Sequence, residues 1–112
     1  MSELTLDPSV FGEMRDLMDD ALEEFVVTYL QNSPLLIEKM RQGLNEQNTE
    51  DIFHAAHQLK GGSGSIGAMK LTDITKTIEQ IAHDGSVDGI EPLLTQLSQE
   101  FERLEKALKA EI

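Results

Sequence analysis

Cysteine and tryptophan are absent from this 112-residue sequence, and aromatic residues are few, with one Tyr and four Phe. The lack of Cys excludes disulfides, thiolate zinc sites and cysteine nucleophiles, and it favours a cytoplasmic location. No apolar run approaches the roughly 20 residues that span a bilayer, and the first ten residues lack a secretory signal. Because Leu, Ile, Met, Ala, Glu and Gln dominate, we expect an all-α fold.

Basic residues are also scarce, with 9 Lys and Arg against 21 Asp and Glu and a formal net charge of −12. Such a chain repels phosphate backbones and anionic headgroups, so we expect neither nucleic acid nor a membrane as a partner. Asp and Glu are missing altogether from residues 52–72, where Lys60 and Lys70 are the charged residues. This acid-free window is the part of the surface where we expect an anion to be tolerated.

Apolar residues recur at helical spacing in four long stretches and one short N-terminal stretch. The connections between them are short, which places consecutive helices antiparallel. The predicted fold is an antiparallel up-down four-helix bundle with a short additional N-terminal helix, forming a single domain over residues 1–112. Met1 and the lack of linker sequence favour a free-standing protein, and the lack of a long exposed apolar stripe favours a monomer.

Capping residues and prolines predict where these helices begin and end. A proline is tolerated in the first turn of a helix but disrupts its interior. The predicted boundaries are Asp7–Pro8 (start of the first helix), Ser33–Pro34 (a kink in the second helix, or a restart with Ser33 as its cap), Asn48–Thr49 (start of the third), Gly85 (left-handed end of the fourth) and Asp88 with Glu91 (capping pair of the last).

Four of the eight Gly lie between positions 61 and 67, within a helical apolar pattern. Glycine inside a helix costs about 1 kcal/mol relative to Ala, so four together need a reason. On a helical wheel, His57 points away from the core side, and Lys60, Gly61 and Gly64 lie along the same outward strip. We interpret Gly61 and Gly64 as a close-approach surface that lets another molecule reach the His57 ring. A simple loop is the alternative for this Gly- and Ser-rich run. The predicted core side consists of Ile52, Ala56, Leu59, Ser63 and Ile66.

A helical hairpin that turns near Ala68 sets residues equally distant from it opposite each other. His57 then lies opposite Glu79, and Lys60 lies opposite Lys76. A carboxylate beside an imidazole N–H fixes the tautomer and makes the other ring nitrogen more basic. This pairing would prepare His57 as a nucleophile toward phosphorus. An ordinary solvated carboxylate is the alternative for Glu79.

Other motif interpretations fit less well. The Gly-x-Gly-x-x-Gly spacing at 62–67 matches a dinucleotide fingerprint, but a helical pattern precedes it instead of a strand, and no Gly-Lys-Ser/Thr follows for a Walker A loop. His54 and His57 could share a metal with Asp51 or His83, but the chain lacks Cys and His-Glu-x-x-His. We therefore expect no metal and no cofactor, and His54 as a neighbouring surface residue. A Ser-His-Asp hydrolase would need a sheet and a nucleophile elbow, and neither is predicted.

Residues 57–67 read His-Gln-Leu-Lys-Gly-Gly-Ser-Gly-Ser-Ile-Gly. This segment resembles the signature of histidine-phosphotransfer (HPt) domains of two-component signalling. Its Lys-Gly-Gly form is similar to the phosphoacceptor domain of chemotaxis histidine kinases. The resemblance implies that His57 is the phosphorylated residue, that Lys60 helps to hold the phosphoryl oxygens, and that Gly61 must be small. It also implies that Glu79 is the carboxylate hydrogen-bonded to the ring.

The predicted function is that of a phosphorelay intermediate, which exchanges a phosphoryl group between His57 and an Asp of a response-regulator receiver domain. The expected partners are receiver domains, a hybrid sensor kinase, or both. Because the sequence contains no nucleotide site, we expect the chain to have no kinase activity of its own. We expect it to accept and donate a phosphoryl group without being an enzyme. The alternative is a four-helix adaptor that binds a receiver or another regulator without phosphotransfer. A small metal- or ligand-binding bundle is a third class.

Overall fold

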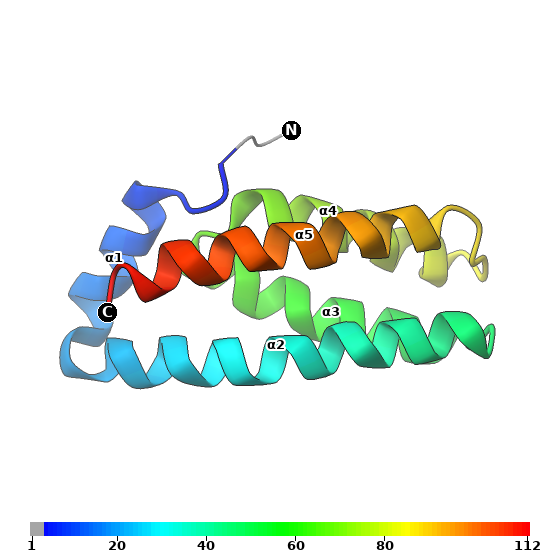
Figure 1. The fold of residues 1–112 in the computed structure, drawn as a ribbon, viewed down its shortest axis with the longest axis horizontal. Helices are drawn as coiled ribbons and strands as arrows, with labels where there is room; N and C mark the ends of the chain where they lie inside the picture. The colour runs from blue at the N-terminus through cyan, green and yellow to red at the C-terminus, as the bar shows by residue number, and fades with distance from the viewer. Residues whose placement is uncertain (1–3) are drawn as a thin grey trace.

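Four long helices lie lengthwise beside one another in the computed structural model, which describes residues 4–112 (Figure 1). They are α2 (Leu22–Asn45), α3 (Thr49–Ile66), α4 (Met69–His83) and α5 (Ile90–Lys109). The shorter α1 (Pro8–Met18) crosses one end of the bundle, and a 3-10 turn, η1 (Asp19–Ala21), joins it to α2. The all-α prediction and the four-helix bundle with an additional N-terminal helix are confirmed.

Two of the predicted helix starts are capped as expected. The Asp7 carboxylate accepts hydrogen bonds from the backbone N–H groups of Ser9 and Val10. The Asn48 side chain accepts one from the backbone N–H of Asp51. Each cap satisfies donors that have no partner within their own helix.

Of the two outcomes predicted at Ser33–Pro34, a kinked helix or a restarted one, the restart is wrong, because α2 continues through Pro34 as one helix of 24 residues. Ser33 is buried within α2, and its hydroxyl donates to the carbonyl oxygen of Tyr29 at 2.6 Å. This side-chain bond stays within the helix, so Ser33 does not act as an N-cap. Packing of the apolar face keeps the helix intact despite the N–H that proline lacks.

The loop from α4 to α5 confirms one prediction and corrects another. Gly85 has φ of 80°, the left-handed conformation expected after the end of α4. The N-cap of α5 is Gly89 with φ of 83°, and no side chain caps this helix. Asp88 therefore does not form the predicted capping pair, and its backbone N–H instead donates to the Ser86 hydroxyl.

The turn between α3 and α4 consists of Gly67 and Ala68, which confirms the predicted hairpin. Gly67 has φ of 91°, and a Cβ built there would lie 3.1 Å from the carbonyl oxygen of Asp7. The Asp7 N–H also donates to the Gly67 carbonyl at 2.8 Å. The start of α1 thus closes over this turn, and only glycine fits both its backbone and its neighbours.

The core side predicted for α3 is buried in the bundle, including Ser63. The Ser63 hydroxyl shares a 2.6 Å hydrogen bond with the hydroxyl of Tyr29 on α2, and this bond satisfies both buried groups. α3 packs most extensively against α4, and next against α2. It is therefore held from two sides and presents a fixed outer face.

No helix within residues 4–112 is long and apolar enough to cross a bilayer.

Candidate functional site

His57 lies on the outer face of α3, and 64% of its side chain is exposed. The glycine-rich run that follows it is helical as far as Ile66, so the loop alternative is wrong. Buried residues on the opposite side of α3 supply the packing that holds these glycines in a helix. The imidazole is thus presented to solvent from a rigid, well-packed element.

Glu79 on α4 reaches the His57 ring across the hairpin. Its Oε2 lies 2.6 Å from Nδ1 of His57, as the ungapped count through the turn predicts. An ionised carboxylate can only accept hydrogen bonds, so Nδ1 carries the proton and donates. In the neutral ring, Nε2 then carries the free lone pair, and it is the nitrogen available for attack.

Lys60, one turn after His57, also pairs with Glu79. Its Nζ lies 2.6 Å from Glu79 Oε1, so the two carboxylate oxygens serve two different partners. Counting residues on either side of Ala68 predicts that Lys60 lies opposite Lys76. The Lys60 ammonium instead reaches the Glu79 carboxylate, which lies three residues further along α4. Opposite charges attract, whereas two ammonium groups repel each other.

Glu79 is largely buried, with 11% of its side chain exposed. Burial alone would raise the pKa of its carboxyl group. The hydrogen bonds from Lys60 and His57, and then the charges of these two residues, outweigh burial and lower that pKa from its ordinary value of 4.5. The carboxylate is therefore held in the ionised form that the His57 hydrogen bond requires.

Gly61 and Gly64 lie on the outer strip of α3. A Cβ built on either would meet nothing within 4 Å, and neither has a positive φ. Neither the backbone nor the packing of the described residues therefore demands glycine at these positions. This openness agrees with their predicted part in a close-approach surface.

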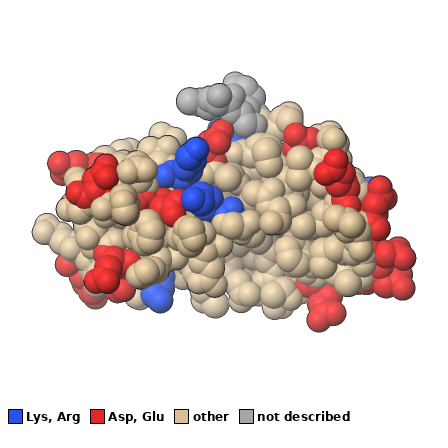
Figure 2. Space-filling model, turned by 180° about the vertical axis from the view of Figure 1, so that it is seen from behind, with Lys and Arg blue, Asp and Glu red and all other residues tan. Residues whose placement is uncertain are grey.

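Charge is unevenly distributed on the face that carries α3 and α4. Figure 2 shows acidic side chains gathered toward the two ends of this face, with a broad uncharged area between them. A few charged side chains of both signs lie near the middle of the view. The uncharged area agrees with the absence of Asp and Glu from residues 52–72, although the carboxylate of Glu79 on α4 lies beside His57.

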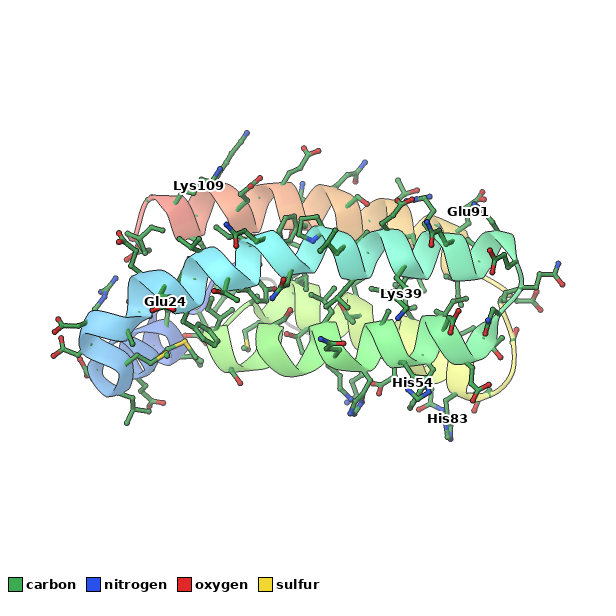
Figure 3. All side chains as sticks on the ribbon, turned by 90° about the horizontal axis from the view of Figure 1, so that it is seen from below. Glu24, Lys39, His54, His83, Glu91 and Lys109 are labelled. Atoms are coloured by element: carbon green, nitrogen blue, oxygen red, sulfur yellow. The ribbon has the colours of Figure 1, made fainter. Side chains whose placement is uncertain are left out.

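His54 and His83 project from the outer side of the bundle close to each other (Figure 3). Both contact the Phe53 ring, His54 edge-on at 5.4 Å and His83 tilted at 5.6 Å between ring centroids. Within residues 4–112, no three or more side chains of His, Asp or Glu form a group that could hold a metal ion. His54 is exposed, as expected of a neighbouring surface residue.

The sequence interpretation missed Phe53. Its ring also stacks on the His57 imidazole, with centroids 5.8 Å apart and planes 15° apart. The i, i+4 spacing of the two aromatic rings on a predicted helix was the signal that could have found this contact.

An exposed histidine on a four-helix bundle, with a carboxylate and an ammonium beside it, is the arrangement expected of a phosphoacceptor domain. The family model of the Hpt domain matches residues 24–107. This match covers well over half of the sequence, and the chain belongs to the Hpt domain family. Membership supports a general role in histidine phosphotransfer within phosphorelay signalling.

Relatives from several organisms agree with this assignment. The chain is 33% identical over 107 residues to histidine-containing phosphotransfer protein 4 of Arabidopsis thaliana, covering 88% of this chain and 83% of that protein. It is 31% identical over 94 residues to the chemotaxis protein CheA of Halobacterium salinarum, covering 79% of this chain but 14% of that protein. Among solved structures, histidine-containing phosphotransfer protein B of Pseudomonas aeruginosa matches with a TM-score of 0.93 and 26% identity. That match covers 98% of this chain and 96% of the other.

Proposed function

We propose that this chain is a phosphorelay intermediate that accepts a phosphoryl group on Nε2 of His57 and exchanges it with an Asp of a receiver domain. The observation that carries the proposal is the 2.6 Å contact between His57 Nδ1 and Glu79. In the neutral ring, the proton held on Nδ1 leaves the lone pair on Nε2, and 64% of the His57 side chain is exposed. A basic, accessible nitrogen is what attack on phosphorus needs.

The proposed phosphoryl transfer needs no reactant other than this chain and the phosphorylated receiver domain. The Nε2 lone pair forms the new bond to phosphorus while the bond from phosphorus to the aspartyl oxygen of the receiver breaks. The receiver carboxylate leaves with the electron pair of that bond. The proton on Nδ1 stays between the ring and Glu79, whose negative charge stabilises the positive charge that develops on the imidazole. Reversal of the same step returns the phosphoryl group to an Asp.

Lys60 supplies the positive charge in this scheme. Lys60 lies one helical turn from His57 and its side chain is 31% exposed, so we expect incoming phosphoryl oxygens to reach its ammonium. A lysine binds such oxygens as a point charge on a flexible stem, and it can swing from Glu79 toward the phosphoryl group. Most of the catalysis in phosphoryl transfer comes from positioning and charge stabilisation, which these side chains provide.

The proposed partners are receiver domains and a hybrid sensor kinase, and the chain itself is proposed to lack kinase activity. A monomeric state and a cytoplasmic location, both expected from the sequence, belong to the same proposal. Gly61 and Gly64 would let the receiver approach closely, because no side chain stands above the helix backbone at these positions.

Phosphotransfer profiling against a panel of purified, phosphorylated receiver domains tests the proposal. At least one receiver should lose its phosphoryl group to the wild-type chain, and none to the His57→Gln variant. The matched control is His54→Gln, which alters the neighbouring exposed histidine and should leave transfer intact. Receiver binding that is unchanged in His57→Gln, with no transfer to either protein, would favour the adaptor alternative instead.

A further inference from the structure

All three histidines of the chain contact one phenyl ring, that of Phe53. Phe53 lies four residues before His57 on α3 and is half-buried against the core. Its ring meets the three imidazoles differently: edge-on to His54, tilted to His83 from the last turn of α4, and nearly parallel to His57. Only His57 also has a carboxylate on its ring nitrogen among the hydrogen bonds of residues 4–112.

Helix geometry explains the stack of Phe53 on His57. Side chains on a helix lean toward its N-terminus, so a residue at i+4 reaches back over the one at i. A centroid distance of 5.8 Å with a 15° angle between planes corresponds to an offset stack, a preferred arrangement of aromatic pairs. Because Phe53 is half-buried, its ring is a firmer support than a solvated side chain would be.

The hydrogen bond and the stack restrain different motions of the imidazole. The hydrogen bond from Nδ1 to Glu79 fixes the direction of the Nδ1 side of the imidazole. The ring can still rotate about the axis of this hydrogen bond. A flat surface against the ring face opposes this tilt. The Nε2 lone pair lies in the ring plane, so a tilted ring would aim the lone pair away from an incoming phosphorus atom.

We propose that Phe53 is a positioning residue that holds the plane of the His57 imidazole, so that Nε2 points outward in one fixed direction. The part of this inference that concerns transfer rests on the proposed function. Phe53 itself touches no reacting atom and acts through His57. The plainer alternative is an i, i+4 pair that slightly stabilises the helix and has no effect on the direction of the ring.

Two substitutions separate these possibilities. Phe53→Leu keeps an apolar side chain but removes the flat ring, and Phe53→Tyr keeps the ring. Phe101→Leu is the matched control, because it removes a buried phenyl ring from α5 that contacts no histidine among residues 4–112. Thermal unfolding of each full-length variant checks that it is folded.

The first measurement is the NMR spectrum of the His57 ring in the unphosphorylated proteins, which needs no partner. A stacked phenyl ring moves the carbon-bound protons of the imidazole upfield. This displacement should be lost in Phe53→Leu and retained in Phe53→Tyr and Phe101→Leu. His57 ring protons at the same position in Phe53→Leu as in the wild type would overturn the proposal, whether or not the chain accepts phosphate.

The second measurement is single-turnover transfer from a phosphorylated receiver, at several receiver concentrations. Phe53→Leu should lower the rate at saturation on the order of tenfold, since small misplacement of a reacting group is costly. The half-saturating receiver concentration should not change, and Phe53→Tyr should restore the rate. An unchanged saturating rate in Phe53→Leu would overturn the positioning role. Failure of the wild-type chain to accept a phosphoryl group would instead refute the proposed function. The NMR result would then still show whether Phe53 stacks on the His57 ring.

Discussion

Glu79 accepts a hydrogen bond from Nδ1 of His57 at 2.6 Å, although the two residues are 22 positions apart and lie on different helices. The two-residue turn at Gly67 and Ala68 makes this pairing possible, because it brings α3 and α4 together without a gap in register. The electrostatic state of the site depends on the same contact. The lowered pKa of Glu79 keeps the carboxylate charged, and the charge holds the proton on Nδ1.

Replacing Glu79 with Gln should slow phosphotransfer to His57 by about 10- to 100-fold, the cost of removing a carboxylate that orients a metal-binding histidine. An amide can donate as well as accept, so it no longer enforces the tautomer with Nδ1–H. Single-turnover transfer gives the rate, and 15N NMR of the His57 ring reports the tautomer. Glu102→Gln alters an exposed carboxylate on α5 and serves as the control. A rate for Glu79→Gln equal to that of the control would contradict this role.

Replacing Lys60 with Met keeps the apolar stem and removes the charge. We expect transfer to fall by about tenfold, less than for a buried oxyanion-hole donor, because Lys60 is partly solvated. The pKa of the Glu79 carboxyl group should rise at the same time, since Lys60 is among the groups that lower it. Carbon-detected NMR titration of Glu79 measures that rise. A Glu79 titration that is the same in both proteins would show that the ion pair does not form in solution.

Gly61→Ala should raise the free energy of unfolding by about 0.5–1 kcal/mol, because alanine favours a helix and its Cβ meets no neighbour. Gly61→Leu should block transfer by filling the space beside the His57 ring, while the chain stays folded. Urea unfolding and single-turnover transfer test the two effects separately. Gly67→Ala is the contrasting variant, and it should destabilise the fold because of its φ of 91° and the nearby Asp7 carbonyl. Undiminished transfer by Gly61→Leu would refute the close-approach interpretation.

The lowered pKa of Glu79 also predicts how stability depends on pH. A carboxyl group whose pKa is lower in the folded state contributes stability that is fully present above its ordinary value of 4.5. This contribution is lost as the pH falls through the lowered folded value. The free energy of unfolding of the wild type should therefore exceed that of Glu79→Gln at neutral pH, with the difference shrinking in acid. Urea unfolding of both proteins along a pH series measures it, and a difference that does not change with pH would rule out the ion pair as a source of stability.

Much of the fold and of the site could be predicted because the apolar periodicity of each helix agrees with the pairing of residues across the turn between α3 and α4. The apolar periodicity defined four long helices, and the count through Ala68 brought His57 and Glu79 together. The restart at Ser33 failed because tertiary packing overrode a local proline signal. The partner of Lys60 was missed because a residue count places backbones opposite each other, whereas a long side chain reaches to the nearest opposite charge. Phe53 was missed because it belongs neither to the predicted core side of the helix nor to the outward strip that starts at His57.

The most direct test of the central claim is to locate the phosphoryl group after the chain has been incubated with a phosphorylated receiver domain. Intact-mass measurement and NMR of the phosphorylated protein should show one acid-labile, base-stable phosphoryl group, bonded to Nε2 of His57. The His57→Gln variant should show none. A phosphoryl group that persists in His57→Gln, or that is bonded to another residue, would contradict the account.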